Sequence, residues 1–332
     1  MGKIKLRLAH GVAVGFVDRE QALRRVEHWA NRGMTVVHVV YGPEGCGKSA
    51  WLKQSAELLK ELDFDVIYVN PIEREFLAEV GVEDVKKRLL EILREAANES
   101  WIKAAWALVD LGRELIRAGR RRMADEVFQA VGLDKAAIYV KGMLGLIEYP
   151  PGDYDVVVTV AATSEGTSRR EIGRHRWAYL DAMWNMAREG FEQLYEQLPG
   201  DKPSFEEIWR LTGGNPKLLG QLYETGWNAD LLIRRIQDEK RLFEFTTSLS
   251  GRERELLREA LEDPDGLVSR EGLPLLDRLV ELNVVVDAMP ARDPEFWIDQ
   301  PPPERDPELG IGARVAWQTP LHREAVRRAL GQ

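Results

Sequence analysis

The sequence has one cysteine, Cys46, and this scarcity excludes an intramolecular disulfide framework and a zinc site built from cysteine ligands. Its five histidines are scattered along the chain, without the close spacing of a metal-ligand motif. No apolar run approaches the length of a membrane span, and residues 1–6 are too few and too charged for a signal peptide. We therefore expect an intracellular, cytoplasmic protein that does not enter a membrane.

An excess of positive charge is also missing. Acidic residues number 55 against 46 basic ones, which gives a formal net charge of −9. A protein that coats nucleic acid by electrostatic attraction needs the opposite balance, so the composition argues against one, although it leaves room for one local basic face. We expect a protein client of unknown identity and do not favour nucleic acid. With 332 residues the chain is long enough for two or three modules, and its oligomeric state stays open.

The most informative stretch runs from residue 36 to residue 50 and reads VVHVVYGPEGCGKSA. An apolar, β-branched run ends in a loop of the pattern G-x-x-x-x-G-K-[ST], which predicts a strand, a phosphate-binding loop and a helix. Glycine lets the backbone approach phosphate oxygens, and the helix beginning near Lys48 points the positive end of its dipole at them. The residues predicted to bind ATP or ADP are Gly42, Pro43, Glu44, Gly45, Cys46, Gly47, Lys48, Ser49 and Ala50.

Two side chains of this loop have predicted chemical roles. Lys48 should reach the β- and γ-phosphates, where its charge stabilises the transition state of hydrolysis. The Ser49 hydroxyl should bind Mg²⁺.

The acidic residues that complete the Mg²⁺ site are ambiguous in the sequence. Asp125 would hold Mg²⁺ and Glu126 would polarise the attacking water, but only two apolar residues directly precede this pair. A buried strand normally has more. The alternative is Asp110, which ends the apolar run 104–109, although apolar residues there recur at helical spacing. We favour Asp125 and Glu126 and keep Asp110 as the alternative.

Three further apolar runs, residues 64–70, 154–164 and 177–184, predict strands of a parallel sheet. The second run ends in Thr163 and Ser164, at the edge where parallel α/β sheets bind ligands. One of these two hydroxyls would orient the attacking water or contact the γ-phosphate; the alternative is an ordinary strand-end cap.

Apolar residues at helical spacing predict helices between these strands. One helix ends near Trp29 and would be capped by Asp18 at its start. Two helices are expected over residues 82–118 and another over residues 136–147.

The pattern changes at residue 186, from which helices dominate. Residues 211–219 form a turn between two of them. From residue 248, two helices, short strands at 283–286 and 313–317, and a closing helix have the outline of a winged helix. Acidic residues outnumber basic ones in this part, which has the wrong sign for DNA phosphates, so we interpret it as an interaction or regulatory module.

Several of these motifs stand in a recognisable order: Phe-Val-Asp-Arg-Glu at 16–20, the loop at 42–49, the acidic pair, the strand at 156–163 and Thr-Gly-Gly-Asn-Pro at 212–216. In that order they resemble the archaeal-type ATPases of the STAND branch of the AAA+ class, over essentially the whole chain. The resemblance implies an α/β P-loop NTPase with a parallel sheet, a helical lid and a C-terminal winged-helix domain. The implied boundaries are 1–185 for the ATPase core, 186–247 for the lid and 248–332 for the winged helix.

The resemblance also implies roles for residues outside the loop. It places Phe16, Val17 and Arg19 near the adenine, and it brings Gly214 and Pro216 of the lid to the nucleotide from the other side. An arginine after the strand that ends at Thr163 marks the hydrolysis state in the family, and Arg174 is the best positional match. Whether Arg174 acts on its own subunit or on a neighbour is open, and an ordinary surface ion pair is the alternative.

The expected function is that of a nucleotide-dependent switch. Mg²⁺-dependent ATP hydrolysis would move the lid and the winged helix, and a slow rate of hydrolysis is compatible with this function. Lys48, Mg²⁺ and Arg174 would stabilise the charge as water positioned by Glu126 attacks in line. The alternatives are a DNA-associated ATPase that docks on duplex DNA through the winged helix and an ATP-binding scaffold with negligible hydrolysis.

Overall fold

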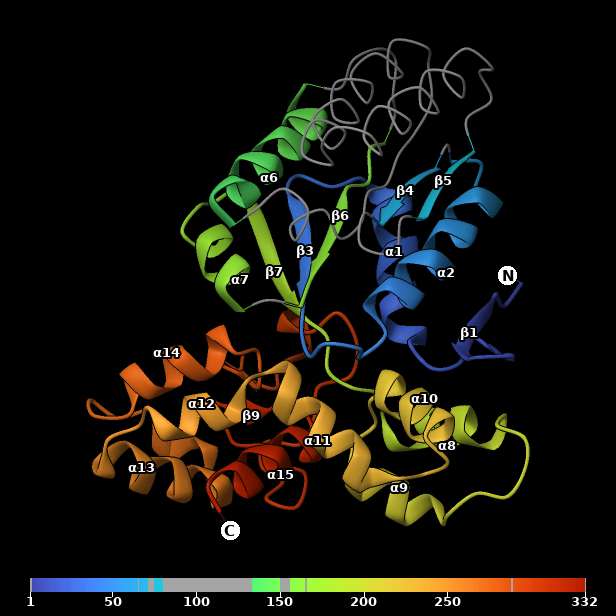
Figure 1. Ribbon diagram of the computed structural model, residues 1–332. Helices are drawn as coiled ribbons and strands as arrows, with labels where there is room; N and C mark the ends of the chain where they lie inside the picture. Colours follow the sequence, from blue (N-terminus) through green and yellow to red (C-terminus); the bar gives the residue numbers. More distant parts are fainter. Residues whose placement is uncertain are drawn as a thin grey trace, which may run out of the picture.

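The computed structural model describes residues 2–64, 66–70, 75–79, 133–149, 156–164, 166–287 and 289–331. Figure 1 shows an α/β half above a helical half, with the N-terminus beside the α/β half and the C-terminus at the base of the helical half. Among the described residues, no helix is long and apolar enough to cross a membrane.

The sheet at the centre of the α/β half has three parallel strands in the order β6 (Val160–Thr163), β3 (Val37–Tyr41) and β7 (Ala178–Ala182). Tyr41 at the end of β3 lies opposite Thr163 on one side and Ala182 on the other, so the carboxyl ends of the three strands are level. The prediction of a parallel sheet around β3 is confirmed. Its level edge is where a parallel α/β fold presents ligand-binding residues.

Helices cover both faces of this sheet, which is why β6 is apolar and buried without alternation. On one face α1 (Glu20–Arg32) and α2 (Lys48–Glu61) share a core with Val40. On the other face α6 (Leu133–Glu148) and α7 (Gly166–Gly173) pack over Val37 and Val39. These helices flank the sheet in Figure 1.

Two antiparallel strand pairs lie beside this sandwich. One is the hairpin of β1 (Lys5–Ala9) and β2 (Val12–Gly15), and the other pairs β4 (Val66–Asn70) with β5 (Glu75–Glu79). The strand predicted at residues 64–70 therefore exists as β4, but the expectation that it is a second parallel strand is wrong. The apolar pattern reported its burial correctly, since Val66 is fully buried, but burial alone does not specify the direction of the partner strand.

Three other predictions differ from the structure or cannot be compared with it. Asp18 does not cap α1: Asp18 and Arg19 both have positive φ, and this turn carries the Asp18 carboxylate to the N–H of Ala187, 3.3 Å away. The run at 154–164 yields strand β6 only from Val160 onward. The helices expected over residues 82–118 lie outside the described residues.

The helical half begins with the lid, which we define as residues 186–247. Its helices are α8 (Arg188–Glu196), α9 (Phe205–Thr212), α10 (Pro216–Glu224), α11 (Ala229–Glu239) and α12 (Leu242–Thr247). Side-chain caps explain several of their starts: Ser204 accepts from the N–H of Glu207, and Asn215 from that of Leu218. Pro216 occupies the first turn of α10, a position that proline favours.

The C-terminal module, residues 248–331, combines helices with one small pair of strands. Its elements are α13 (Gly251–Glu262), η1 (Pro264–Leu267), α14 (Leu273–Glu281), β8 (Val285–Val286), η2 (Pro294–Phe296), β9 (Ala316–Trp317) and α15 (Pro320–Ala329). Ser250 begins α13 with a complete capping box to Glu253. The antiparallel pair β8–β9 follows two helices, in the order that the sequence indicated.

The lid and the C-terminal module share one hydrophobic core. Phe191, Leu219 and Ile233 of the lid belong to the same buried cluster as Leu257 and Val326 of the C-terminal module. Helix α15 packs against α11, α12 and α9 of the lid as well as against α13. This core continues across the boundary at residue 247, so a movement of either part involves the other.

Candidate functional site

The loop between β3 and α2 adopts the conformation that its glycines predict. Gly47 caps the start of α2 with a φ of 104°, and Gly45 has a φ of 76°. A Cβ on Gly45 would lie 2.4 Å from Cβ of Lys217, so glycine is needed both for the backbone angle and for the approach of α10. The free N–H groups in the first turn of α2 begin where this loop ends, which makes a site for anions.

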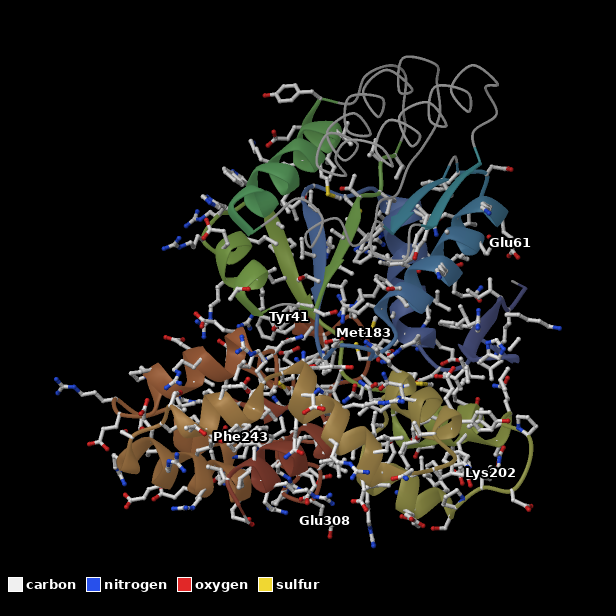
Figure 2. The ribbon with its side chains drawn as sticks, viewed as in Figure 1. Tyr41, Glu61, Met183, Lys202, Phe243 and Glu308 are labelled. Carbon is white, nitrogen blue, oxygen red and sulfur yellow. The ribbon has the colours of Figure 1, made fainter. Side chains whose placement is uncertain are left out.

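The start of the loop is pressed against the end of β7. A Cβ on Gly42 would lie only 1.8 Å from the carbonyl oxygen of Met183, and the Met183 N–H donates to Tyr41 O at 2.8 Å. Figure 2 shows Tyr41 and Met183 at the end of the sheet that meets the helical half. The loop therefore rises from the carboxyl edge of the sheet with little freedom at its first residue.

Lys48 is buried, and its ammonium lies over the arch of the loop. Nζ donates to the carbonyl oxygens of Gly42 at 3.1 Å and Pro43 at 2.9 Å, and lies 3.6 Å from Sγ of Cys46. Cys46 is fully buried beside Met183, which makes it a small core residue of the loop. The ammonium group of Lys48 thus contacts both the first residues of the loop and Cys46. It lies where we expect the charge of the phosphates.

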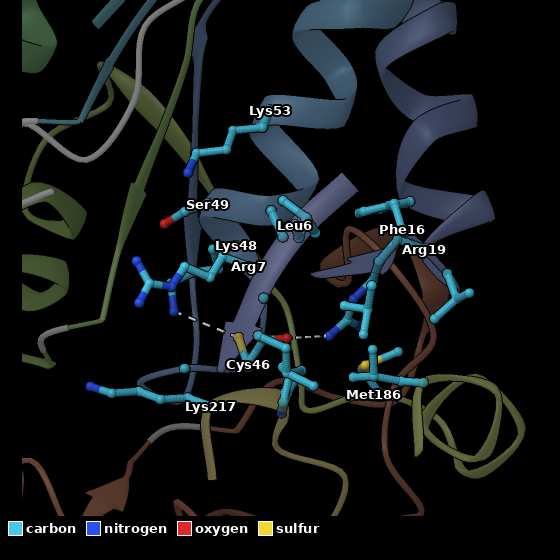
Figure 3. A pocket seen from close by; sticks show the side chains of 18 of the residues that line it. Leu6, Arg7, Phe16, Arg19, Cys46, Lys48, Ser49, Lys53, Met186 and Lys217 are labelled. Atoms are coloured by element: carbon cyan, nitrogen blue, oxygen red, sulfur yellow. Dashed lines mark hydrogen bonds between the residues drawn. The ribbon is translucent and has the colours of Figure 1, made fainter. Parts of the chain in front are cut away.

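A cleft of about 400 Å³ opens between the loop, the β1–β2 hairpin, α8 and α10 (Figure 3). Among the described residues that line it, Glu224 is the only acidic one. The basic residues that line it are Arg7, Arg19, Lys48, Lys53 and Lys217. A highly charged anion such as a triphosphate fits this balance.

The other part of the cleft wall is apolar. Leu6, Leu8, Val14, Phe16, Val17, Met186 and Leu194 line it. Phe16 and Met186 lie on the same side of the cleft in Figure 3, away from the amines of Lys48 and Lys53. One charged end and one apolar end suit a nucleotide, whose phosphates and base differ in the same way.

Most of the residues predicted to bind the nucleotide line this cleft together. They are Gly45, Cys46, Gly47, Lys48, Ser49 and Ala50 of the loop, Phe16, Val17 and Arg19 before it, and Pro216 of the lid. Ser164, one of the two hydroxyls at the end of β6, lines it as well. Segments separated by more than 150 residues in the chain thus meet around one space.

Other predicted residues lie near the cleft but do not line it. Thr163 is buried at the end of β6 beside Tyr41, and Gly214 packs against Met186, whose N–H donates to Gly214 O at 3.0 Å. Arg174 lies in the turn directly after α7, with its side chain 73% exposed, and pairs with Glu171 at 2.9 Å. The contact between Arg174 and a nucleotide stays a prediction.

The predicted acidic ligands cannot be placed. Asp125, Glu126 and the alternative Asp110 lie outside the described residues. Within the described part of the chain, no group of three or more His, Cys, Asp and Glu side chains forms a metal site. For Mg²⁺, the described residues offer the Ser49 hydroxyl on the wall of the cleft, beside the loop.

Several residues of the cleft were missed from the sequence. Lys53 follows Ser49 by one helical turn, so the α-helical period would have placed it on the same face of α2. The β1–β2 hairpin had a signal in the alternation of KLRLAHGVAVG around a glycine. Lys217 had none beyond its place after Pro216.

The Glu44 side chain connects the loop to three other segments. Lys217 Nζ lies 2.6 Å from Oε1, Lys240 Nζ lies 3.5 Å from Oε2, and Asn283 donates to Oε2 at 3.4 Å. Partial burial alone would raise the pKa of Glu44, but the ammonium groups of Lys217 and Lys240 outweigh it and lower the pKa to about 2. Glu44 therefore stays ionised at any physiological pH.

The backbone of Glu44 makes matching connections. Its N–H donates to Oε1 of Gln318 at 2.9 Å, and its carbonyl oxygen accepts from Nδ2 of Asn215 at 2.8 Å. Asn215 belongs to the lid and Gln318 to the C-terminal module. One residue of the loop is thus hydrogen-bonded to both.

Arg19 lines the cleft, but its guanidinium reaches the loop rather than the apolar wall. Nη1 donates to Oδ2 of Asp299 at 2.9 Å, and Nη2 donates to the carbonyl oxygens of Cys46 at 2.6 Å and Trp184 at 2.9 Å. Asp299 was not singled out in the sequence, where it stands in a proline-rich stretch.

Comparison with protein families gives a match over much of the chain. A family described as an ATPase domain predominantly from Archaea matches residues 16–222. No curated protein sequence matches the chain.

Solved structures give more distant likenesses. A Walker-type ATPase of Pyrococcus abyssi has a TM-score of 0.48 and 17% identity, over 94% of this chain and 96% of that one. DnaA of Aquifex aeolicus bound to AMPPCP has a TM-score of 0.38 and 16% identity, over 73% and 74% of the two chains. The Orc1 protein of Aeropyrum pernix in complex with DNA has a TM-score of 0.37 and 15% identity, over 95% and 92%.

Proposed function

Since the family match covers residues 16–222, this chain belongs to the ATPase-domain family found predominantly in Archaea, and we propose that it works as an ATP-dependent switch. As a member it is a P-loop ATPase, which binds ATP and hydrolyses it to ADP and phosphate. The proposal is that the nucleotide in the loop sets the position of the lid and of the C-terminal module.

The phosphates would be held by groups that already face the cleft. The N–H groups of the loop and of the first turn of α2 would bind phosphate oxygens, with Lys48 across the β- and γ-phosphates. Ser49, with Asp125 from the sequence, would hold Mg²⁺, whose charge neutralises that of the phosphates. Glu126 is the proposed residue that orients the attacking water.

One observation carries the switch: Glu44, inside the phosphate loop, is bonded to the lid and to the C-terminal module. Lys217 lines the cleft and pairs with Glu44 at 2.6 Å, so a triphosphate and Glu44 compete for the same ammonium group. When a γ-phosphate attracts Lys217, the pair with Glu44 weakens and α10 is released from the loop. Because α10 and the C-terminal module share one core, both respond.

Amide hydrogen exchange tests this coupling. We expect residues 213–219 and 316–322 to exchange at different rates in the ATP-bound protein, read with a slowly hydrolysed ATP analogue, and in the ADP-bound protein. Lys48→Ala should abolish triphosphate binding and with it the difference. Glu44→Gln should still bind ATP within a few-fold of the normal affinity but lose most of the difference, because its amide cannot form the ion pairs.

The matched control is Glu192→Gln, the same substitution at an exposed position of α8. It should behave like the unaltered protein. Identical exchange in the ATP-bound and ADP-bound states of the unaltered protein would refute the switch while leaving the ATPase assignment intact.

A further inference from the structure

Arg19 and Asp299 form a buried ion pair between residues 280 positions apart in the chain. The side chains are 3% and 4% exposed, and Arg19 Nη1 lies 2.9 Å from Asp299 Oδ2. Burial opposes the charge on Arg19, but the carboxylates of Asp299 and Asp18 outweigh it and raise the pKa of Arg19. Arg19 is therefore charged, and neither side chain has solvent to replace a lost partner.

Asp299 is held firmly by its own backbone neighbours. The N–H of Ile298 donates to the carbonyl oxygen of Ala182 at 2.9 Å, and Trp297 forms a β-bridge with Ala182. Trp297 and Ile298 are fully buried. The C-terminal module thus makes an isolated β-bridge with the end of β7, and Asp299 follows directly after the two bonded residues.

The second nitrogen of Arg19 acts on the phosphate loop itself. Nη2 donates to the carbonyl oxygen of Cys46 at 2.6 Å and to that of Trp184 at 2.9 Å. In a trans peptide the carbonyl oxygen and the following N–H point in opposite directions. With Cys46 O turned toward Arg19, the N–H of Gly47 points away from Arg19, and Gly47 lines the cleft between Cys46 and Lys48.

We propose that Asp299 and Arg19 are positioning residues for phosphate binding: Asp299 orients Arg19, and Arg19 fixes the Cys46–Gly47 peptide so that its N–H faces the β-phosphate. The C-terminal module then completes the ATP site without touching the nucleotide. This role rests on ATP binding by the loop and is independent of the switch. It places the action of Arg19 at the phosphate end of the nucleotide, whereas the family resemblance implied a position beside the adenine.

Affinities for nucleotides with different numbers of phosphates test this role, because AMP lacks the β-phosphate and ADP has it. Asp299→Asn keeps the size of the side chain and removes its charge. We expect it to weaken ADP binding about tenfold, as the loss of one charge-assisted hydrogen bond does, and to change AMP binding less than twofold. Titration calorimetry of each nucleotide, or competition against a fluorescent ADP analogue, gives both values.

Asp293→Asn is the matched control, because it makes the same substitution at an exposed position of the same segment. It should leave the affinities for ADP and AMP unchanged. An equal loss of AMP and ADP affinity in Asp299→Asn would overturn the proposal and would instead support a position of Arg19 beside the adenine.

A double variant separates positioning from a structural role. Replacing a buried ion pair by apolar residues of similar volume often leaves stability unchanged, so Arg19→Met with Asp299→Leu should unfold near the normal temperature. It lacks the donor to Cys46 O, so its ADP affinity should stay about tenfold low. Recovery of ADP affinity together with thermal stability would show that the pair serves only the fold, and would refute the positioning role.

Discussion

Among the described residues, two clusters of ion pairs join the C-terminal module to the ATPase core, and they contact different parts of it. The first is the pair of Arg19 and Asp299. The guanidinium of Arg19 also donates to backbone carbonyls of the phosphate loop and of the chain after β7. The second joins Arg169 and Arg170 of α7 to Asp287, which follows β8. The first cluster fixes a backbone segment of the ATP site; the second fixes a helix.

The second cluster has a buried part and an exposed part. Arg169 is buried, contacts the Asp287 carboxylate, donates to Asp287 O at 2.9 Å and lies 5.0 Å from the centre of the Tyr41 ring. Arg170 is 41% exposed and lies 2.7 Å from both Asp287 and Asp277, and Asp277 is 56% exposed. Burial therefore falls from Arg169 outward to Asp277.

The two clusters therefore differ in whether they affect nucleotide binding or only the attachment of the C-terminal module. A change in the first cluster alters the loop and should appear in nucleotide affinity. A change in the second cluster should appear mainly in stability and in the placement of α7, which begins two residues after Ser164. The same kind of interaction thus has different consequences according to whether its donor reaches backbone of the site.

The largest effect on stability is expected from Asp287→Ala. It would leave Arg169 buried without its carboxylate, which costs about 3 kcal/mol of unfolding free energy, because an unpaired buried charge is far more costly than a lost surface pair. Urea unfolding followed by circular dichroism measures this. The affinity for ADP should change less than twofold, in contrast to Asp299→Asn. A loss below about 1 kcal/mol would mean that Arg169 finds solvent or another partner.

A smaller effect is expected from pH at the joint around Glu44. His322 is buried, and burial first, then the charge of Lys240, lowers its pKa from 6.5 to about 4. Lys217 acts in the same direction, while Glu44 opposes them. Because the folded state binds the proton less tightly than the unfolded chain, stability is full above pH 6.5 and declines as the pH falls toward 4.

This decline should amount to about 1–2 kcal/mol between pH 8 and pH 5 in urea unfolding. His322→Gln should remove it in that range. Glu44, with its pKa lowered from 4.5 to about 2, contributes a further loss only as the pH falls from 4.5 toward 2. A stability that stays constant from pH 8 to pH 5 in the unaltered protein would contradict the burial of neutral His322.

Local patterns in the sequence were enough for the phosphate loop and for most of the elements. The β-branched run before Gly42 predicted β3, and the glycine pattern with the Lys-Ser that ends it predicted the loop and the start of α2. These features depend on neighbours within a few residues, so the sequence contains them directly. The parallel sheet followed from the continuous apolar character of its strands.

Contacts across the chain could not be predicted in the same way. Glu44 and Lys217 are 173 positions apart, and Arg19 and Asp299 are 280 apart. No periodicity links such residues, because their meeting depends on how the lid and the C-terminal module pack. The proline-rich stretch around Asp299 even resembles a loop without a task, yet it supplies a buried carboxylate. The direction of β4 was predicted wrongly for a related reason. The apolar run at 64–70 indicates a strand, but whether the strand is parallel or antiparallel depends on its partner.

The smallest effect is expected from Asp277→Asn, which tests the exposed end of the second cluster. Asp277 pairs with Arg170 at 2.7 Å, but both side chains are more than 40% exposed, so water and salt screen the pair. Unfolding free energy should fall by less than about 0.5 kcal/mol, and the difference should vanish in high salt. Asp287→Asn, measured alongside, should cost more and respond less to salt, because its partner Arg169 is buried. If the two substitutions lower the unfolding free energy by the same amount, solvent exposure does not determine how much each ion pair of this cluster contributes to stability. The contrast between a buried and a screened pair would then be wrong for this interface.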